Sequence, residues 1–211
     1  MGSEGKLSKR LGSLGVDALR DAGIEPAALV ALLARLGTSD PVDPKLTVEE
    51  LVASFDLARF GRAPARFSEA ELTQLNARIL HRMPFEAVAA RLPEGMNLAA
   101  WEAVRPNLFQ FADVDDLWGI IDGANIYPTQ PEEADYLAQA ATIAASLDWS
   151  ADPWHQLINA LKETTGRKGM PLFLPLRLAL TGLNHGPDMA ALLPLIGREA
   201  AIARLQAAAR G

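Results

Sequence analysis

Apolar residues recur along the chain with the spacing of helices rather than that of strands. Between residues 68 and 81 they fall on one helical face, at Leu72, Leu75, Ile79 and Leu80. A second apolar run begins at Pro26 and is closed by Gly37, which is the usual order of these two residues at the ends of a helix. No alternation of apolar and polar residues lasts long enough to indicate a strand. The pattern therefore predicts an all-α protein.

Capping residues and turns mark the ends of the predicted helices. Thr47 and Ser68 each precede a glutamate by three residues, which is the spacing of a capping box. The helices are expected at about residues 17–20, 26–36, 47–54, 68–81, 85–92, 101–104, 114–121, 131–146, 153–165, 172–180, 188–195 and 199–209. Proline-rich breaks between them divide the chain into three predicted helical parts, residues 1–70, 71–128 and 129–211.

Composition narrows the class of protein. Hydrophobic residues make up 49% and charged residues 22% of the 211 residues, as in ordinary globular domains. The chain has no cysteine, which excludes disulfides and thiolate metal sites, and its three histidines are too far apart in sequence to predict a metal site. No apolar run approaches the roughly 20 residues of a membrane helix, and the first residues lack the features of a signal peptide. We therefore expect a cytoplasmic protein with no membrane partner and no metal site.

The net charge of −6 hides an uneven distribution. Five arginines lie between residues 59 and 82 with only two acids, and four bases lie between residues 162 and 177 with one acid. Residues 94–135 carry nine acids and one base. Such clusters suit a protein that meets phosphates on one side, but solvated helix faces explain them equally well at this point.

Few segments carry candidate chemistry of their own. Lys6, Ser8 and Lys9 lie in a short loop that could wrap a polyphosphate, although the same residues are common in frayed termini. The turn at residues 182–187 contains His185 and fits a recognition loop or a helix cap. Motifs of phosphate-binding loops, serine hydrolases and zinc proteases are absent. The four tryptophans favour core packing over base stacking.

Taken together in order, these segments resemble the bacterial glutamyl-tRNA synthetases, which are class I aminoacyl-tRNA synthetases. Lys6-Leu-Ser-Lys-Arg10 is similar to the family's Lys-Met-Ser-Lys-Ser signature loop. Further matching segments are Leu51-Val-Ala-Ser-Phe-Asp-Leu57, Leu72-Thr-Gln-Leu-Asn76 and, most specifically, Gly169-Met-Pro-Leu-Phe-Leu-Pro-Leu-Arg-Leu-Ala-Leu-Thr-Gly182 with His185-Gly-Pro-Asp-Met189. The resemblance runs from the signature loop to the C-terminus. It implies a stem-contact helical subdomain followed by a two-part α-helical anticodon-binding domain.

The resemblance also implies how the whole enzyme works. It would ligate glutamate to the tRNA 3′ end with ATP and Mg²⁺, and its Rossmann-type catalytic domain would lie before residue 1. Lys6, Ser8 and Lys9 would bind ATP, and Lys9 would act as the catalytic lysine that steadies the pyrophosphate leaving group. Without the catalytic domain we expect no bound ATP and no aminoacylation by this chain.

For tRNA binding, the resemblance implies residues at two places in the chain. They are Arg105, Asn107, Arg177, Gly186, Pro187 and Met189. Discriminating members carry a second arginine where this chain has Asn107, so the resemblance adds tRNA-Gln to tRNA-Glu as a candidate partner. A further family arginine is replaced near Asn159, with Lys162 or Arg167 as possible substitutes.

We expect a monomer that binds tRNA and not DNA. The rival interpretation is a stand-alone helical module, derived from this domain, that binds other proteins.

Overall fold

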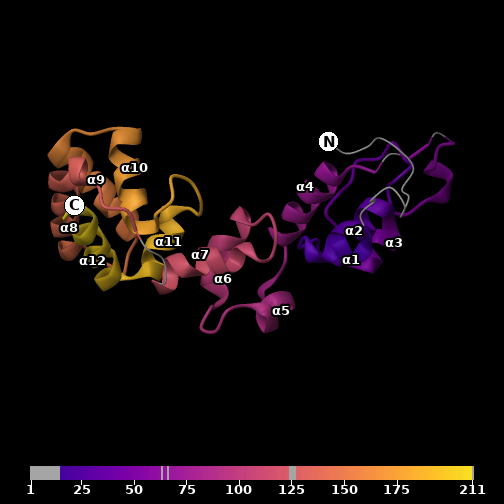
Figure 1. Ribbon diagram of the computed structural model, residues 1–211, viewed down its shortest axis with the longest axis horizontal. Helices are drawn as coiled ribbons and strands as arrows, with labels where there is room; N and C mark the ends of the chain where they lie inside the picture. The colour runs from indigo at the N-terminus through magenta and orange to yellow at the C-terminus, as the bar shows by residue number, and fades with distance from the viewer. Residues whose placement is uncertain (1–14, 63, 66, 124–126, 211) are drawn as a thin grey trace. The chain divides into compact units, whose positions relative to one another are not determined.

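The computed structural model describes residues 15–62, 64–65, 67–123 and 127–210, and every regular element within these ranges is a helix (Figure 1). The prediction of an all-α protein is therefore confirmed. The chain forms two compact units. Unit 1 comprises the residues up to Arg91 together with Leu108–Asp113, and unit 2 comprises Leu92–Asn107 together with the residues from Val114 onward. The division into three parts at residues 70 and 128 stays a prediction.

Unit 1 is built from short helices around α4. Its elements are α1 (Val16–Asp21), α2 (Pro26–Leu33), α3 (Val48–Ser54), the 3-10 turn η2 (Leu57–Arg59), α4 (Glu69–Leu80), α5 (Phe85–Val88) and η3 (Ala89–Arg91). Helix α2 packs on α4 and buries Leu32 against Leu72 and Ile79. Ser68 caps α4 as the sequence predicts, because its side chain accepts a hydrogen bond from the Glu71 amide at 3.2 Å.

Helix α2 ends earlier than the sequence predicts. It begins at Pro26 but stops at Leu33, whereas the apolar run continues to Leu36. Past the helix end, the Arg35 guanidinium donates a hydrogen bond of 2.9 Å to the carbonyl of Ser54, the last residue of α3. A contact between segments far apart in sequence therefore occurs where periodicity predicts another helical turn.

A fully buried asparagine joins three segments of unit 1. The Asn76 side chain on α4 accepts a hydrogen bond from the Glu25 amide at 2.8 Å and donates to the carbonyls of Gly23 at 3.2 Å and Phe109 at 2.9 Å. The Glu25 carboxylate, at the start of α2, receives two hydrogen bonds from Arg91 at 2.7 and 3.1 Å. These contacts attach residues 108–113 to α2 and α4, although more than 30 residues separate the partners in sequence.

Unit 2 is a bundle of longer helices. Its elements are α6 (Leu98–Val104), η4 (Arg105–Asn107), α7 (Asp113–Asp122, in this unit from Val114), η5 (Pro131–Glu133), α8 (Ala134–Ser146), α9 (Pro153–Thr165), α10 (Met170–Thr181), α11 (Met189–Ile196) and α12 (Arg198–Ala209). Helix α12 packs on α8 and α10, and α11 packs on α9 and α6. Trp101 and Trp154 are buried, which confirms the core prediction for these two tryptophans.

The buried arginine Arg204 holds two helix ends in unit 2. Its Nη1 donates hydrogen bonds to the carbonyls of Ile120 at 2.7 Å and Leu180 at 2.8 Å, in the last turns of α7 and α10. Carbonyls at a helix C-terminus lack partners within their own helix and attract positive charge. The guanidinium also lies over the Tyr127 ring, at 4.4 Å from its centroid. Arg204 therefore has a structural role that the sequence did not indicate.

A second arginine compensates for a proline inside α10. Pro175 has no amide hydrogen, so the carbonyl of Pro171 lacks its usual helical donor. The Arg167 guanidinium donates a hydrogen bond to this carbonyl at 3.1 Å, forms an ion pair with Glu133, and lies 4.0 Å from the centroid of the Tyr136 ring. Arg167 therefore already has protein partners and is poorly placed to serve as a nucleic-acid contact.

The two tyrosines of the chain are expected to titrate above their ordinary pKa of 10. Burial raises the pKa of Tyr136 to about 12 against the opposing effect of Arg167, and burial also raises the pKa of Tyr127. Because the folded pKa values exceed the unfolded ones, the stability that they contribute is complete below about pH 10 and is lost as the pH rises toward 12. Ultraviolet absorbance of tyrosinate measures this. Tyr136→Phe should remove the later part of the curve, and titration of both phenols near pH 10 in the folded protein would contradict the prediction.

Candidate nucleic-acid interface

Arg177 lies on α10 and is held by the loop that follows this helix. Its Nη2 donates a hydrogen bond of 2.7 Å to the carbonyl of Pro187. Gly186 has a φ of +141°, and a Cβ built on it would lie 3.6 Å from Arg177 Nη1. The loop backbone therefore approaches the guanidinium closely at a residue whose conformation favours glycine. Three residues named from sequence, Arg177, Gly186 and Pro187, are thus brought together by the structure.

The Arg177 guanidinium has unused donor capacity. Its Nη1 is buried and has no hydrogen-bond partner among the described residues. Burial lowers the pKa of this group, and the nearby Asp188 carboxylate opposes that shift. A guanidinium remains charged in proteins, and a buried donor without a partner costs free energy. A base oxygen or nitrogen would satisfy this donor if the loop backbone at Gly186, which lies against it, shifted to expose it.

The loop around Arg177 presents a mixed surface. Leu183, Asn184 and His185 are exposed, whereas Pro187 is buried. Met189 is only 3% exposed and begins α11, so its side chain belongs to the core of unit 2. The backbone of the first turn of α11 is fixed by the Asp188 side chain, which accepts a hydrogen bond from the Ala190 amide. The exposed residues of the loop, rather than Met189, are the ones accessible to a partner.

Arg105 and Asn107 form the ends of the 3-10 turn η4, directly after α6. Both side chains are half-buried. Helix α6 packs against α11, which follows the Arg177 loop. These two residues therefore lie in the same unit as Arg177, on an element continuous with a helix that packs beside the loop.

The two basic clusters of the sequence differ in what their cations contact. In the first cluster, Arg59 pairs with Asp40 at 2.8 Å, while Arg78 and Arg82 donate to the carbonyls of Val42 and Pro44. These arginines hold the segment of residues 40–44. In the second cluster, Arg167 has the protein partners described above, whereas Lys162 and Lys168 are exposed, as is Asn159. Lys162 is therefore more accessible to a partner than Arg167.

The signature loop with Lys6, Ser8 and Lys9 lies outside the described residues. Within them, no group of three or more histidines, aspartates and glutamates is placed to hold a metal ion. No helix in the described ranges is both long and apolar enough to cross a membrane.

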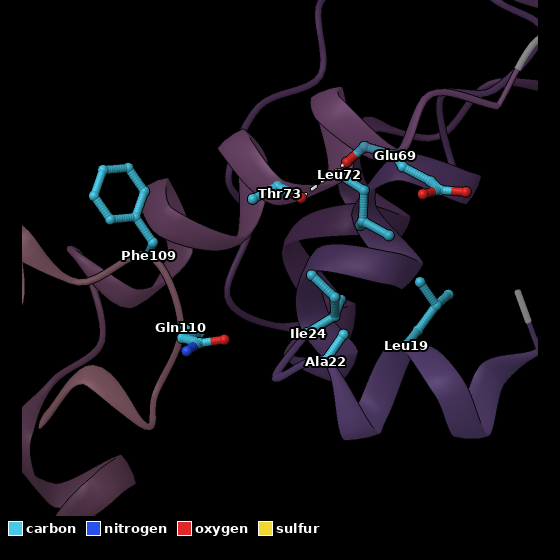
Figure 2. A pocket seen from close by; sticks show the side chains of 8 residues that line it. All are labelled: Leu19, Ala22, Ile24, Glu69, Leu72, Thr73, Phe109 and Gln110. Carbon is cyan, nitrogen blue, oxygen red and sulfur yellow. Dashed lines mark hydrogen bonds between the residues drawn. The ribbon is translucent and has the colours of Figure 1, made fainter. Parts of the chain in front are cut away.

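A cavity of about 150 Å³ in unit 1 offers different chemistry. Figure 2 shows that it lies between the α1–α2 turn, the start of α4 and residues 109–110. Its lining is mainly apolar, with Leu19, Ile24 and Leu72, and its one charged group is the Glu69 carboxylate. A pocket with a carboxylate and no cation is unsuited to a polyanion. The Arg177 loop, rather than this cavity, is the candidate site for nucleic acid.

Comparison with known proteins identifies a domain family over the part of the chain that contains Arg177. A family model described as "Anticodon binding domain" matches residues 122–209, which include Arg177 and its loop. The chain is 61% identical over 207 residues to glutamate–tRNA ligase 1 of Novosphingobium aromaticivorans and 60% identical over 209 residues to glutamate–tRNA ligase 1 of Rhizorhabdus wittichii. These matches cover 98% and 99% of this chain and 47% of each relative. The chain therefore spans about half the length of the curated relatives that it matches.

The chain is also similar to solved structures of glutamate–tRNA ligases. The crystal structure of a glutamate tRNA ligase from Elizabethkingia meningosepticum in complex with its amino acid matches with a TM-score of 0.72 and 25% identity. The match covers 99% of this chain and 49% of the chain in that crystal structure. The glutamate–tRNA synthetase of Elizabethkingia anophelis matches with a TM-score of 0.66 and 28% identity. None of these matches favours the alternative of a protein-interaction module.

Proposed function

Because this chain belongs to the glutamyl-tRNA synthetase family, of which it forms the anticodon-binding C-terminal part, we propose that it binds the anticodon loop of tRNA-Glu through Arg177 and the loop of residues 182–188. The observation that supports this proposal is the half-buried Arg177 guanidinium, which donates to the Pro187 carbonyl and keeps an unpaired Nη1 beside Gly186. Anticodon bases are splayed out and are read by arginine side chains, loop backbone and apolar contacts. The Arg177 loop offers these three kinds of group within a few residues.

The proposal extends to the whole protein, of which this chain is a part. That protein would ligate glutamate to tRNA with ATP, and Mg²⁺ would accompany the nucleotide. By resemblance, Lys6 and Ser8 would shape the ATP-binding loop and Lys9 would contact the phosphates. ATP supplies the activating phosphoanhydride when it is bound, whereas the described residues of this chain supply tRNA recognition. We further propose that the protein is a cytoplasmic monomer and that this chain alone has no ligase activity.

Asn107 bears on the choice between tRNA-Glu and tRNA-Gln. An arginine presents a fixed fork of donors that accepts one base edge and rejects others, whereas the asparagine amide offers both a donor and an acceptor. We propose that Asn107 tolerates the anticodons of both tRNAs. Arg105, at the other end of η4, would position this turn against the loop of the tRNA.

The proposed tolerance predicts the effect of Asn107→Arg. We expect this variant to keep its affinity for tRNA-Glu and to bind tRNA-Gln about tenfold more weakly, because the guanidinium restores a selective donor set. Fluorescence anisotropy with labelled transcripts measures both affinities, and Gln206→Arg, at an exposed position of α12 to which no tRNA contact is assigned, controls for added charge. Rejection of tRNA-Gln by the unaltered chain would contradict the role given to Asn107.

The experiment that tests the function itself compares tRNA-Glu, tRNA-Gln and an unrelated tRNA at two salt concentrations. Phosphate contacts alone give binding that weakens with salt and is the same for all three. We expect the first two to bind more tightly than the third at both concentrations. Equal binding of all three tRNAs would contradict anticodon reading by this chain.

A further inference from the structure

Two exposed apolar side chains precede Arg177 on the same face of α10. Met170 is 71% exposed and Phe173 is 39% exposed. Positions 170, 173 and 177 are three and four residues apart, so their side chains lie in one line along the helix. We call Lys168, Met170 and Phe173 the α10 strip. Single exposed apolar residues are common, but here two are aligned with a proposed RNA contact.

The strip is open to solvent and its aromatic ring is held in place. Gly166 precedes the strip and Gly169 lies between Lys168 and Met170, and a Cβ built on either glycine would have no heavy atom within 4 Å. The Phe173 ring lies 6.4 Å from the Trp154 ring, centroid to centroid, on α9. This contact fixes the Phe173 ring beside α9 while leaving part of it exposed. A fixed ring loses little side-chain entropy when a base stacks on it.

The positive charge and the length of the α10 strip favour RNA as its ligand. Lys168 is exposed and adds positive charge at the end of the strip farthest from Arg177, in a chain whose net charge is −6. The seven residue steps from Met170 to Arg177 span about 10 Å, at 1.5 Å per step. Nucleotides stacked about 3.4 Å apart would place roughly three along this length. The strip also continues directly from the proposed anticodon site.

We propose that the α10 strip is a stacking platform for anticodon-loop nucleotides adjacent to the triplet. Phe173 would stack on one base, Met170 would pack its thioether on the next, and Lys168 would meet a phosphate. Stacking on an aromatic ring tolerates any base. The strip therefore contributes affinity without selecting a sequence, whereas Arg177 selects. This inference rests on the proposed function.

The test uses the full chain with the paired changes Met170→Gln and Phe173→Leu. The first replaces a thioether by a polar chain of similar length, and the second keeps apolar volume against Trp154 but removes the aromatic face. Leu98→Gln is the matched control, because Leu98 is 48% exposed and begins its helix as Met170 does. Thermal unfolding of each variant checks that the fold is intact.

We expect the paired variant to bind tRNA-Glu at least about fivefold more weakly, and to lose the same factor for a tRNA-Glu whose triplet is altered. The fluorescence of 2-aminopurine placed beside the triplet should be quenched by the unaltered chain and less so by the variant. Unchanged affinity of the paired variant, or an equal loss in Leu98→Gln, would overturn the inference.

The two proposals can fail separately. If the unaltered chain prefers tRNA-Glu and Arg177→Gln abolishes that preference while the paired variant binds normally, the platform is wrong and the function stands. If the unaltered chain shows no preference among tRNAs, the proposed function has failed. The platform then fails too, because the strip was proposed to bind nucleotides next to an anticodon held at Arg177.

Discussion

Arg204→Met is expected to lower the free energy of unfolding of unit 2 by about 3 kcal/mol. The variant loses two hydrogen bonds from a charged donor, each worth about 1.5 kcal/mol or more. The two acceptors, the carbonyls of Ile120 and Leu180, end α7 and α10 and would be left without this donor. Methionine fills much of the space but cannot donate. In the unaltered chain, part of the stability from these hydrogen bonds offsets the cost of burying the charged guanidinium. The same burial lowers the pKa of Arg204.

Urea unfolding followed by circular dichroism measures this change. Arg210→Met is the matched control, because Arg210 follows the same helix and is exposed. It should change the stability by less than about 0.5 kcal/mol. Arg204→Lys keeps the charge but loses the fork of donors, so an intermediate loss is expected. A stability of Arg204→Met equal to that of the unaltered chain would show that the two carbonyls find other partners.

Arg177→Gln is expected to weaken binding of tRNA-Glu by about ten- to a hundredfold, the range for hydrogen bonds from a charged donor. The glutamine side chain is shorter and neutral, so it cannot both hold the Pro187 carbonyl and reach a base. Arg177→Lys keeps the positive charge and should recover only part of the affinity, because one ammonium cannot replace a fork of five donors.

The control for charge alone is Arg210→Gln, which removes the same charge from an exposed position. It should leave the preference between tRNAs unchanged. The Tm of each variant separates a binding defect from a folding defect, since the Arg177 bond to Pro187 also closes the loop before α11. An equal effect of the two substitutions on selectivity would contradict a specific role for Arg177.

The helices were largely predictable from sequence because their signals are local. Ser68 and Thr47 cap the helices that they were expected to cap, and Pro26 begins α2. The predicted end of α2, at residue 36, was wrong by three residues, because the Arg35 contact with Ser54 joins segments distant in sequence. Such contacts cannot be recognised from the spacing of apolar and polar residues along the chain.

The site was predictable only in part, for the same reason. The resemblance named Arg177, Gly186 and Pro187, which the structure brings together, but it could not reveal that the Met189 side chain is buried. Basic clusters were equally ambiguous. Arg167 and Arg204 have partners within the protein, and only the fold shows which carbonyls they meet. The burial of Asn76 depends on residues 109 and 23, which no local pattern connects.

The most direct test of anticodon reading is a double-mutant cycle between Arg177 and the anticodon triplet. Four affinities are measured, for the unaltered chain and Arg177→Gln with tRNA-Glu and with a tRNA-Glu whose triplet is replaced. If Arg177 contacts the triplet, the two changes are coupled, and replacing the triplet costs much less affinity in the variant than in the unaltered chain, by about tenfold. Independent effects that simply multiply would show that Arg177 does not read the anticodon.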